Sequence, residues 1–197
     1  MVVDPDGELV QRIAEGDAAA ARALMARHLP RVLSLARRML GNAADAEDVA
    51  QETFLRAWNS AARWRPGQAK FETWLHRVAI NQCYDRLRKR RGVALDDIAD
   101  PVDPGPPPGS ALETSDTIKA VEAALARLPE RQRAAIVLCH YDGQSNIAAA
   151  ETLGISVDAL ESLLARGRRA LREMLSGFVR GDAREEPGST KKRKTGP

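Results

Sequence analysis

The sequence predicts an all-α protein of two small helical domains joined by an acidic Pro-rich linker, the second domain containing a helix-turn-helix. Hydrophobic residues make up 44% of the chain and aromatic residues only 4%, a balance that favours helices packed through aliphatic stripes. A run of Pro and Gly from Asp103 to Gly109 divides the chain. Beyond it, the segment from Gly143 to Arg172 reads as an Ala-rich helix, a Leu-Gly turn and a second helix that ends in arginines, the pattern of a helix-turn-helix.

The first domain is expected at residues 8–92. A short amphipathic turn at its start ends at Gly16, and Asp17 is well placed to cap the Ala-rich helix that follows. We expect Pro30 to interrupt or kink this helix, because proline lacks the N–H that an interior helical position needs. Gly41 should end it.

Two further helices complete the first domain. Asp45, with Asp48 three residues later, resembles an N-terminal capping arrangement for a helix that reaches Trp58. The last and longest helix of the domain is expected from Phe71 to Arg91. Residues 93–113 should then form an extended, semi-rigid and acidic linker, since this stretch is rich in Pro and carries several carboxylates but no Lys or Arg.

The second domain is expected at residues 114–177. A helix from Thr114 to Arg127 comes first, Pro129 sits in the first turn of the next helix, and the helix-turn-helix follows. Residues 178–197 are rich in Gly, Pro and charge, which predicts a disordered basic tail. Its lysine-rich end resembles a nuclear targeting tetrad, although a solvated segment that binds phosphate weakly is the preferred interpretation.

Composition excludes several classes of protein. The net charge is only +3, so any affinity for phosphate must come from local basic clusters, of which Arg86 to Arg91 and Arg166 to Arg172 are the strongest. The chain has no apolar stretch long enough to cross a bilayer and no signal peptide, so we expect a soluble cytoplasmic protein without membrane insertion. Isolated cysteines and the lack of a phosphate loop or nucleophile motif predict no metal, no cofactor and no enzymatic activity.

One face of the helix from Phe71 suggests contact with nucleic acid. Its apolar residues fall within one arc, and the opposite arc combines guanidinium groups, an amide and an aromatic ring. Arginine neutralises phosphate, Asn hydrogen-bonds base edges and a ring can stack on an unpaired base. The residues of this face are Arg77, Asn81, Tyr84 and Arg88, and the turn before the helix adds Trp64 and Arg65. A solvated amphipathic helix with a basic end is the alternative interpretation.

The helix after Asp45 has the opposite polarity. Its exposed side carries Asp45, Asp48, Gln51, Glu52 and Leu55. Such a surface repels DNA and favours a basic protein partner, although acidic residues near a helix start also stabilise the helix dipole by themselves.

The final helix of the helix-turn-helix should read DNA. An inward stripe of Leu160, Leu164 and Leu171 includes Gly167, which would permit close approach of a neighbouring helix. Residues in the first turns of a recognition helix meet base edges, and later arginines meet phosphate. The candidate DNA contacts are therefore Ser156, Asp158, Glu161, Ser162, Arg166, Arg168 and Arg169. A helix-turn-helix lookalike without a DNA role is the alternative.

Three motifs together resemble one protein family. The segments Asp45 to Trp58, Phe71 to Asn81 and Leu128 to Arg133, followed by the helix-turn-helix, resemble the extracytoplasmic-function sigma factors of bacterial RNA polymerase. The resemblance covers about residues 8–175. Two positions depart from the family's usual pattern: Ile80 replaces a common arginine, and Glu161 stands in the recognition helix where a basic residue is frequent.

The resemblance implies a dissociable promoter-recognition subunit. The acidic helix with Asp48, Gln51 and Glu52 would bind the clamp coiled coil of the largest polymerase subunit. The face with Asn81 would recognise and hold open the −10 element, and the helix-turn-helix would read the −35 element on the flap of the second-largest subunit. An anti-sigma protein and a stress or environmental signal are further implied. Two other functions remain open, a stand-alone helix-turn-helix repressor or activator and a helical adaptor that binds no nucleic acid.

Overall fold

The computed structural model describes residues 4–65, 70–93 and 112–181, and every regular element in these ranges is helical. The first module contains α1 (Gly7–Ala14), α2 (Ala18–Leu40), α3 (Ala43–Ala61) and α4 (Phe71–Val93). The second contains α5 (Leu112–Arg127), α6 (Glu130–Ile136), the π-helical turn η1 (Val137–Tyr141), α7 (Asn146–Leu153) and α8 (Val157–Gly181). The all-α prediction is confirmed. Most of the predicted linker (residues 93–113) and of the predicted tail (residues 178–197) lies outside the described residues, which leave out 94–111 and 182–197.

Local capping explains where the helices of the first module begin and end. The Asp17 carboxylate accepts from the N–H groups of Ala19 and Ala20 at the start of α2, and Gly41 ends α2 at φ +65°, as predicted. The capping prediction for Asp45 is wrong. Asn42 is the N-cap of α3, and its side-chain oxygen accepts the Asp45 N–H at 3.0 Å.

Of the two effects expected of Pro30, an interruption or a kink, the interruption does not occur, because α2 continues through it to Leu40. Pro30 removes one backbone hydrogen bond. Buried side chains on both sides of it, including Leu24, Val32 and Leu35, hold the helix against its neighbours. Tertiary packing of an apolar face stabilises most protein helices, and here it outweighs the local cost of the proline.

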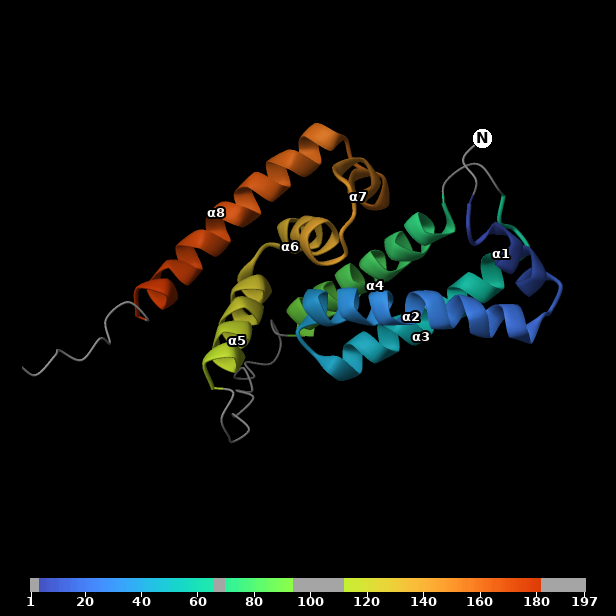
Figure 1. Cartoon of the computed structure of the whole chain (residues 1–197), viewed down its shortest axis with the longest axis horizontal. Helices are drawn as coiled ribbons and strands as arrows, with labels where there is room; N and C mark the ends of the chain where they lie inside the picture. Colours follow the sequence, from blue (N-terminus) through green and yellow to red (C-terminus); the bar gives the residue numbers. More distant parts are fainter. Residues whose placement is uncertain (1–3, 66–69, 94–111, 182–197) are drawn as a thin grey trace, which may run out of the picture.

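The core of the first module lies between α2, α3 and α4, which pack side by side in the lower right of Figure 1. Its fully buried side chains are Val32, Leu35, Met39, Val49, Phe54, Phe71, Leu75 and Ile80. The N-terminal segment also fixes the start of α4, since the Asp4 carboxylate accepts the Phe71 N–H at 2.8 Å. Helix α4 therefore turns one face to this core and the other away from it, as its sequence predicts.

In the second module α5, α6 and α7 pack against α8, and α7 also lies beside α4 of the first module (Figure 1). Pro129 is the N-cap of α6, one position before the first turn where it was expected. Helix α8 continues to Gly181, so residues 178–181 are helical and do not belong to the expected tail. In the described part of the chain, no helix is long and apolar enough to span a bilayer.

Candidate functional site

The acidic start of α3 is engaged within the first module. Arg86 of α4 lies with Nη1 3.1 Å from Asp45 Oδ1 and 3.4 Å from Asp48 Oδ2, and Arg90 forms a second ion pair with Asp45. Asp45 is half-buried as a result. The expectation that Asp45 faces a partner freely is therefore corrected, and so is the expectation that Arg86 and Arg90 are available for phosphate. Asp48 keeps most of its side chain exposed.

Further along α3, the predicted residues border an apolar groove. Glu52 pairs with Arg56 at 2.9 Å on the helix surface. Gln51 and Leu55 line a groove of about 470 Å³ between α2 and α3, and the Leu55 side chain is 49% exposed although it is large and apolar. The other apolar side chains that line it are Met25, Leu29, Leu33, Ala50, Phe54 and Trp58.

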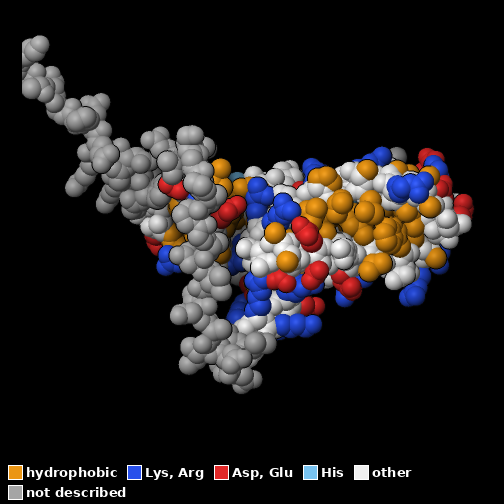
Figure 2. Space-filling view, turned by 90° about the horizontal axis from the view of Figure 1, so that it is seen from below, with side chains coloured by type: hydrophobic (Ala, Val, Ile, Leu, Met, Phe, Trp, Pro, Cys, Tyr) orange, Lys and Arg blue, Asp and Glu red, His pale blue; other side chains and the backbone are white. Residues whose placement is uncertain are grey.

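This groove coincides with a gathering of hydrophobic side chains on the surface of the first module. Figure 2 shows them over the right-hand part of the molecule, with acidic and basic groups around them. Sequence reasoning missed the contribution of α2. The signal was present, because Met25, Leu29 and Leu33 recur every four residues and so form a single row on one helix.

The outer face of α4 borders a different, polar cavity. Asn81, Tyr84 and Arg88 line about 460 Å³ together with residues of α6 and α7. Burial raises the pKa of Tyr84 to about 12, so its phenol stays neutral and can donate a hydrogen bond. Arg88 pairs with Asp85 on the helix surface. Three of the four residues predicted on this face therefore meet at one site, away from the apolar groove.

The remaining residues of this predicted site are held elsewhere. Arg77 donates from Nε to the Thr152 carbonyl at 3.3 Å and from Nη2 to the Glu151 carbonyl. Trp64 is half-buried, with its ring edge-on to Phe71 at 5.4 Å between ring centroids and also packed on Trp74. The Trp64 indole therefore packs against the start of α4 and is not exposed for stacking on a nucleic-acid base. Arg65 is exposed.

The helix-turn-helix has the predicted caps and turn. Ser145 Oγ accepts the Ala148 N–H at the start of α7, Gly154 turns the chain at φ +65°, and Ser156 Oγ accepts the Ala159 N–H at the start of α8. Leu160 and Leu164 are buried. A Cβ added at Gly167 would lie 3.0 Å from Ile136 Cγ1, which confirms the predicted close approach of α6 and α8.

The outer surface of α8 carries the predicted DNA contacts. Its exposed residues include Ser156, Asp158, Glu161, Ser162, Arg166, Arg168 and Arg169. Glu161 accepts a hydrogen bond from the Asn146 side chain of α7 at 3.2 Å, and Arg166 Nε donates to the Ser162 carbonyl at 3.1 Å. The first turns of α8 are therefore acidic and polar, and the basic groups begin two turns later.

Comparison with known proteins decides the family. The profile of Sigma-70 region 2 matches residues 24–93, and that of Sigma-70 region 4 matches residues 118–171. The chain is 31% identical to the ECF RNA polymerase sigma factor SigW of Bacillus subtilis, over 84% of this chain and 94% of that protein. It is 34% identical to SigM of Mycobacterium tuberculosis, over 86% and 84%.

The chain belongs to the ECF sigma factors of RNA polymerase.

Other relatives of this sigma factor agree. SigE of Mycolicibacterium smegmatis is 37% identical over 78% of this chain, and the match covers 60% of that longer protein. Among solved structures, CnrH in complex with the cytosolic domain of CnrY is similar with a TM-score of 0.66 and 31% identity, over 88% of this chain and 99% of that one. The sigma factor RpoE of Bartonella quintana, solved with the anti-sigma factor NepR, gives a TM-score of 0.65 and 26% identity, over 79% and 96%.

Proposed function

We propose that this sigma factor directs core RNA polymerase to two-part promoters, with separate surfaces for the enzyme and for each promoter element. The observation that carries the proposal is the separation of the two candidate sites on the first module. Leu55 and Gln51 border the apolar groove between α2 and α3, whereas Asn81 and Tyr84 border the polar cavity on α4. Two partners of different chemistry can therefore be bound at the same time.

The apolar groove is the proposed polymerase-binding surface. Protein interfaces combine a desolvated apolar centre with a polar rim, and the lining of the groove combines apolar Leu55, Phe54 and Trp58 with polar Glu47 and Gln51. The clamp coiled coil of the largest subunit is the partner implied by the family. Asp48 and Glu52 would add charge complementarity at the rim, whereas Asp45 acts within the module.

The polar cavity is the proposed binding site for the opened strand of the −10 element. Flipping a base out of the duplex costs a few kcal/mol, which stacking and hydrogen bonds to the exposed base can recover. Asn81 offers an amide for a base edge, Tyr84 a neutral phenol, and Arg88 a charge for phosphate. The chain supplies no catalytic step, because nucleotide addition belongs to the polymerase.

The exposed face of α8 is the proposed reader of the −35 element. Asp158, Glu161 and Ser162 would meet base edges in the major groove, and Glu can accept from cytosine N4. Arg166, Arg168 and Arg169 would bind phosphates. As a partner of polymerase the protein would act in the cytoplasm, in response to a stress or environmental signal. The sigma factor RpoE of Bartonella quintana, solved in complex with the anti-sigma factor NepR, supports an anti-sigma partner for this chain.

Transcription in vitro with purified core polymerase tests the proposal. Genomic fragments should yield discrete transcripts only when the sigma factor is present. Leu55→Asp should weaken binding to core polymerase at least about tenfold, since it places a charge in the apolar centre of the interface. Asn81→Ala should leave core binding nearly unchanged and impair promoter opening, measured by permanganate reactivity of unpaired thymines.

These variants separate the two surfaces from each other and from a stand-alone regulator. Loss of core binding in Asn81→Ala, or native core binding in Leu55→Asp, would contradict the assigned surfaces. A stand-alone repressor or activator would instead bind a duplex operator tightly without polymerase. No initiation on any genomic fragment, together with such binding, would replace the proposal with that alternative.

A further inference from the structure

The recognition helix carries a carboxylate that helix stability does not explain. Helix α8 begins at Val157, and Glu161 is exposed in its second turn. The helix dipole favours acidic residues chiefly in the first turn, and Asp158, three residues before Glu161, carries the same charge, which weakens a helix slightly. The next basic residue of the helix, Arg166, donates to the Ser162 carbonyl. In the described part of the chain no ion pair involves Glu161, so charge pairing does not account for its position either.

A hydrogen bond between the two helices of the helix-turn-helix restrains this carboxylate. Asn146 is the first residue of α7, directly after the N-cap Ser145. Its side-chain Nδ2 donates to Glu161 Oε1 at 3.2 Å. A carboxylate has about four lone-pair sites on its two oxygens. The bond therefore limits the directions in which the Glu161 side chain can point and leaves Oε2 available to a further donor.

The Asn146 amide is oriented in turn by a thiol. Cys139 Sγ, on η1, donates to Asn146 Oδ1 at 3.9 Å, a weak hydrogen bond. Burial raises the pKa of the Cys139 thiol above its ordinary value, so the thiol keeps the proton that it donates. Because the amide oxygen faces this thiol, the amide nitrogen faces Glu161. The three side chains form one series from η1 through α7 to α8.

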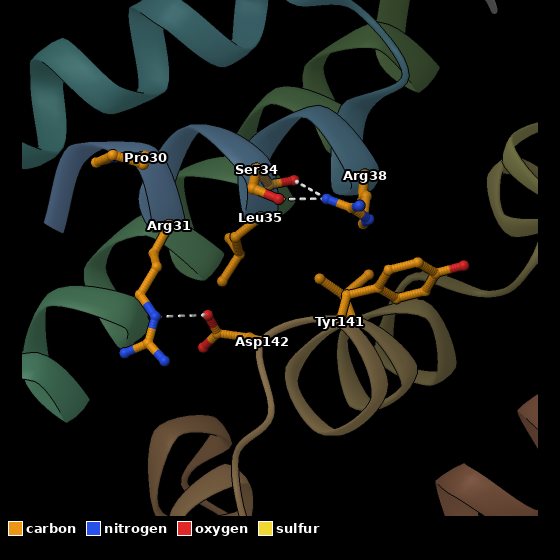
Figure 3. A pocket seen from close by; sticks show the side chains of 8 residues that line it. Pro30, Arg31, Ser34, Leu35, Arg38, Tyr141 and Asp142 are labelled. Atoms are coloured by element: carbon orange, nitrogen blue, oxygen red, sulfur yellow. Dashed lines mark hydrogen bonds and ion pairs between the residues drawn. The ribbon is translucent and has the colours of Figure 1, made fainter. Parts of the chain in front are cut away.

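All three residues of this series belong to the second module. The contacts of η1 and the following residue with the first module involve other side chains. Figure 3 shows Tyr141 close to Arg38 and Asp142 close to Arg31, both arginines from α2, around a pocket of about 260 Å³. The Arg38 guanidinium carbon lies 4.3 Å from the centre of the Tyr141 ring, and Arg31 Nε lies 3.7 Å from Asp142 Oδ1. The restraint on Glu161 therefore needs no residue of the first module.

A restrained carboxylate in the major groove discriminates between bases. Cytosine presents the N4 amino group as a donor, whereas guanine O6 and N7 and thymine O4 are acceptors that repel a carboxylate. Adenine places the N7 acceptor beside its N6 donor, so a carboxylate gains less there. A mobile Glu side chain could turn away from a wrong base and lose little. A restrained one cannot, and the repulsion then adds to specificity.

We propose that Asn146 is a positioning residue that holds Glu161 against a cytosine of the −35 element, so that this sigma factor selects a C·G pair at one position. The assignment rests on the proposed function of α8 as the reader of that element. A lysine or arginine in place of Glu161 would favour guanine on the contacted strand instead. The hydrogen bond from α7 therefore supports the feature of the recognition helix that departs most from the usual family pattern.

Transcription by the complete holoenzyme on altered promoters tests the assignment. The template is the genomic fragment that gives the strongest transcript, with each base pair of its −35 region replaced in turn by the other three. The wild type should prefer C at one position by about 5- to 150-fold. Glu161→Ala should abolish this preference, and Glu161→Gln should shift it towards adenine, since Gln can bond to both N6 and N7. Ratios at one position cancel the general effect of the altered charge on DNA affinity.

Variants of Asn146 separate positioning from a merely structural role. Asn146→Ala should lower the preference for C about 2- to 12-fold at this position alone, because an unrestrained Glu161 must be ordered on binding. Asn146→Asp keeps the shape of the side chain but replaces the donor by a carboxylate, and should lower the preference at least as far. In the Glu161→Ala background neither change should alter base preference. Glu151→Ala, at an exposed position of α7, is the matched control and should behave as the wild type.

The outcomes distinguish failure of the positioning role from failure of the proposed function. If the wild type initiates transcription but both Asn146 variants keep its preference for C, the positioning role is overturned and the sigma function stands. A loss of preference spread over all positions, or one that persists in the Glu161→Ala background, would also overturn it. Retention of the preference in Glu161→Ala would place the base contact on another residue and refute the assignment. If the wild type yields no transcript from any fragment, the proposed function fails and the assignment fails with it.

Discussion

A buried hydrogen bond connects α3, which carries residues proposed to bind polymerase, to α4, which carries residues proposed to bind DNA. Gln82 Nε2 of α4 donates to Thr53 Oγ1 of α3 at 3.0 Å, and the two residues are 6% and 0% exposed. Thr53→Val removes the acceptor and keeps the shape of the side chain. The Gln82 amide is then left buried without this partner, which costs about 1–3 kcal/mol. At about 2–4 °C per kcal/mol for a chain of this length, Tm should fall by about 2–12 °C.

The reciprocal change should cost less. In Gln82→Leu the Thr53 hydroxyl can still donate to the carbonyl four residues earlier in its own helix, so we expect a loss of about 0.5–1.5 kcal/mol. The double variant should be close to the wild type, because neither polar group remains unpaired. The coupling energy between the two sites should then equal the sum of the two single losses, about 1.5–4.5 kcal/mol.

Tryptophan fluorescence during thermal and urea unfolding is the suitable assay. All three tryptophans, Trp58, Trp64 and Trp74, lie in the first module, so their emission follows this module and not the second. An unchanged Tm in Thr53→Val would refute the reasoning, as would a double variant that loses the sum of the two single effects. In vitro transcription by the double variant should remain close to that of the wild type.

Two further predictions concern stability. Burial raises the pKa of Asp6, but its bonds to His28 and Arg27 outweigh this effect and hold the pKa below its ordinary value. The contribution of Asp6 to stability is therefore present above about pH 4 and lost as the pH falls through the lowered pKa. Asp6→Asn should lower Tm at pH 7, and its Tm should converge with that of the wild type in acid. A Tm difference that stays constant with pH would contradict this linkage. Gly167→Val should destabilise the second module by about 1–3 kcal/mol, because the added Cβ would lie 3.0 Å from Ile136 Cγ1. Circular dichroism during urea unfolding measures the free energy of unfolding. A variant more stable than the wild type would show that the Ile136 side chain moves aside freely.

Much of the local structure could be predicted from sequence because it depends on local chemistry. The Asp17 and Ser156 caps, the turns at Gly41 and Gly154, and the buried stripe with Gly167 all follow from spacing and residue type. The error at Pro30 occurred because distant residues decide there: packing against neighbouring helices carries α2 through the proline. The error at Asp45 was local, since Asn42, three residues earlier, is the N-cap of α3.

The candidate sites show the same limit. Sequence spacing placed Asn81, Tyr84 and Arg88 on one face of α4, and they line one cavity. It did not show that Arg86 and Arg90 reach back to Asp45, because the partner lies about 40 residues away and periodicity within one helix says nothing about its neighbour. The apolar groove was missed for a related reason, since its two walls come from different helices.

By itself, the sequence determined the helical class, the helix-turn-helix, the family and the faces of α4 and α8 that carry polar groups. These properties depend on spacing along one segment, where 3.6 residues per turn fixes which side chains share a face. Only the tertiary structure decided which of these faces are free. The pairing of Asp45 with two arginines, the groove beside Leu55 and the contact of Arg77 with α7 each join residues far apart in the chain, and such contacts are chosen by packing and charge across the whole fold.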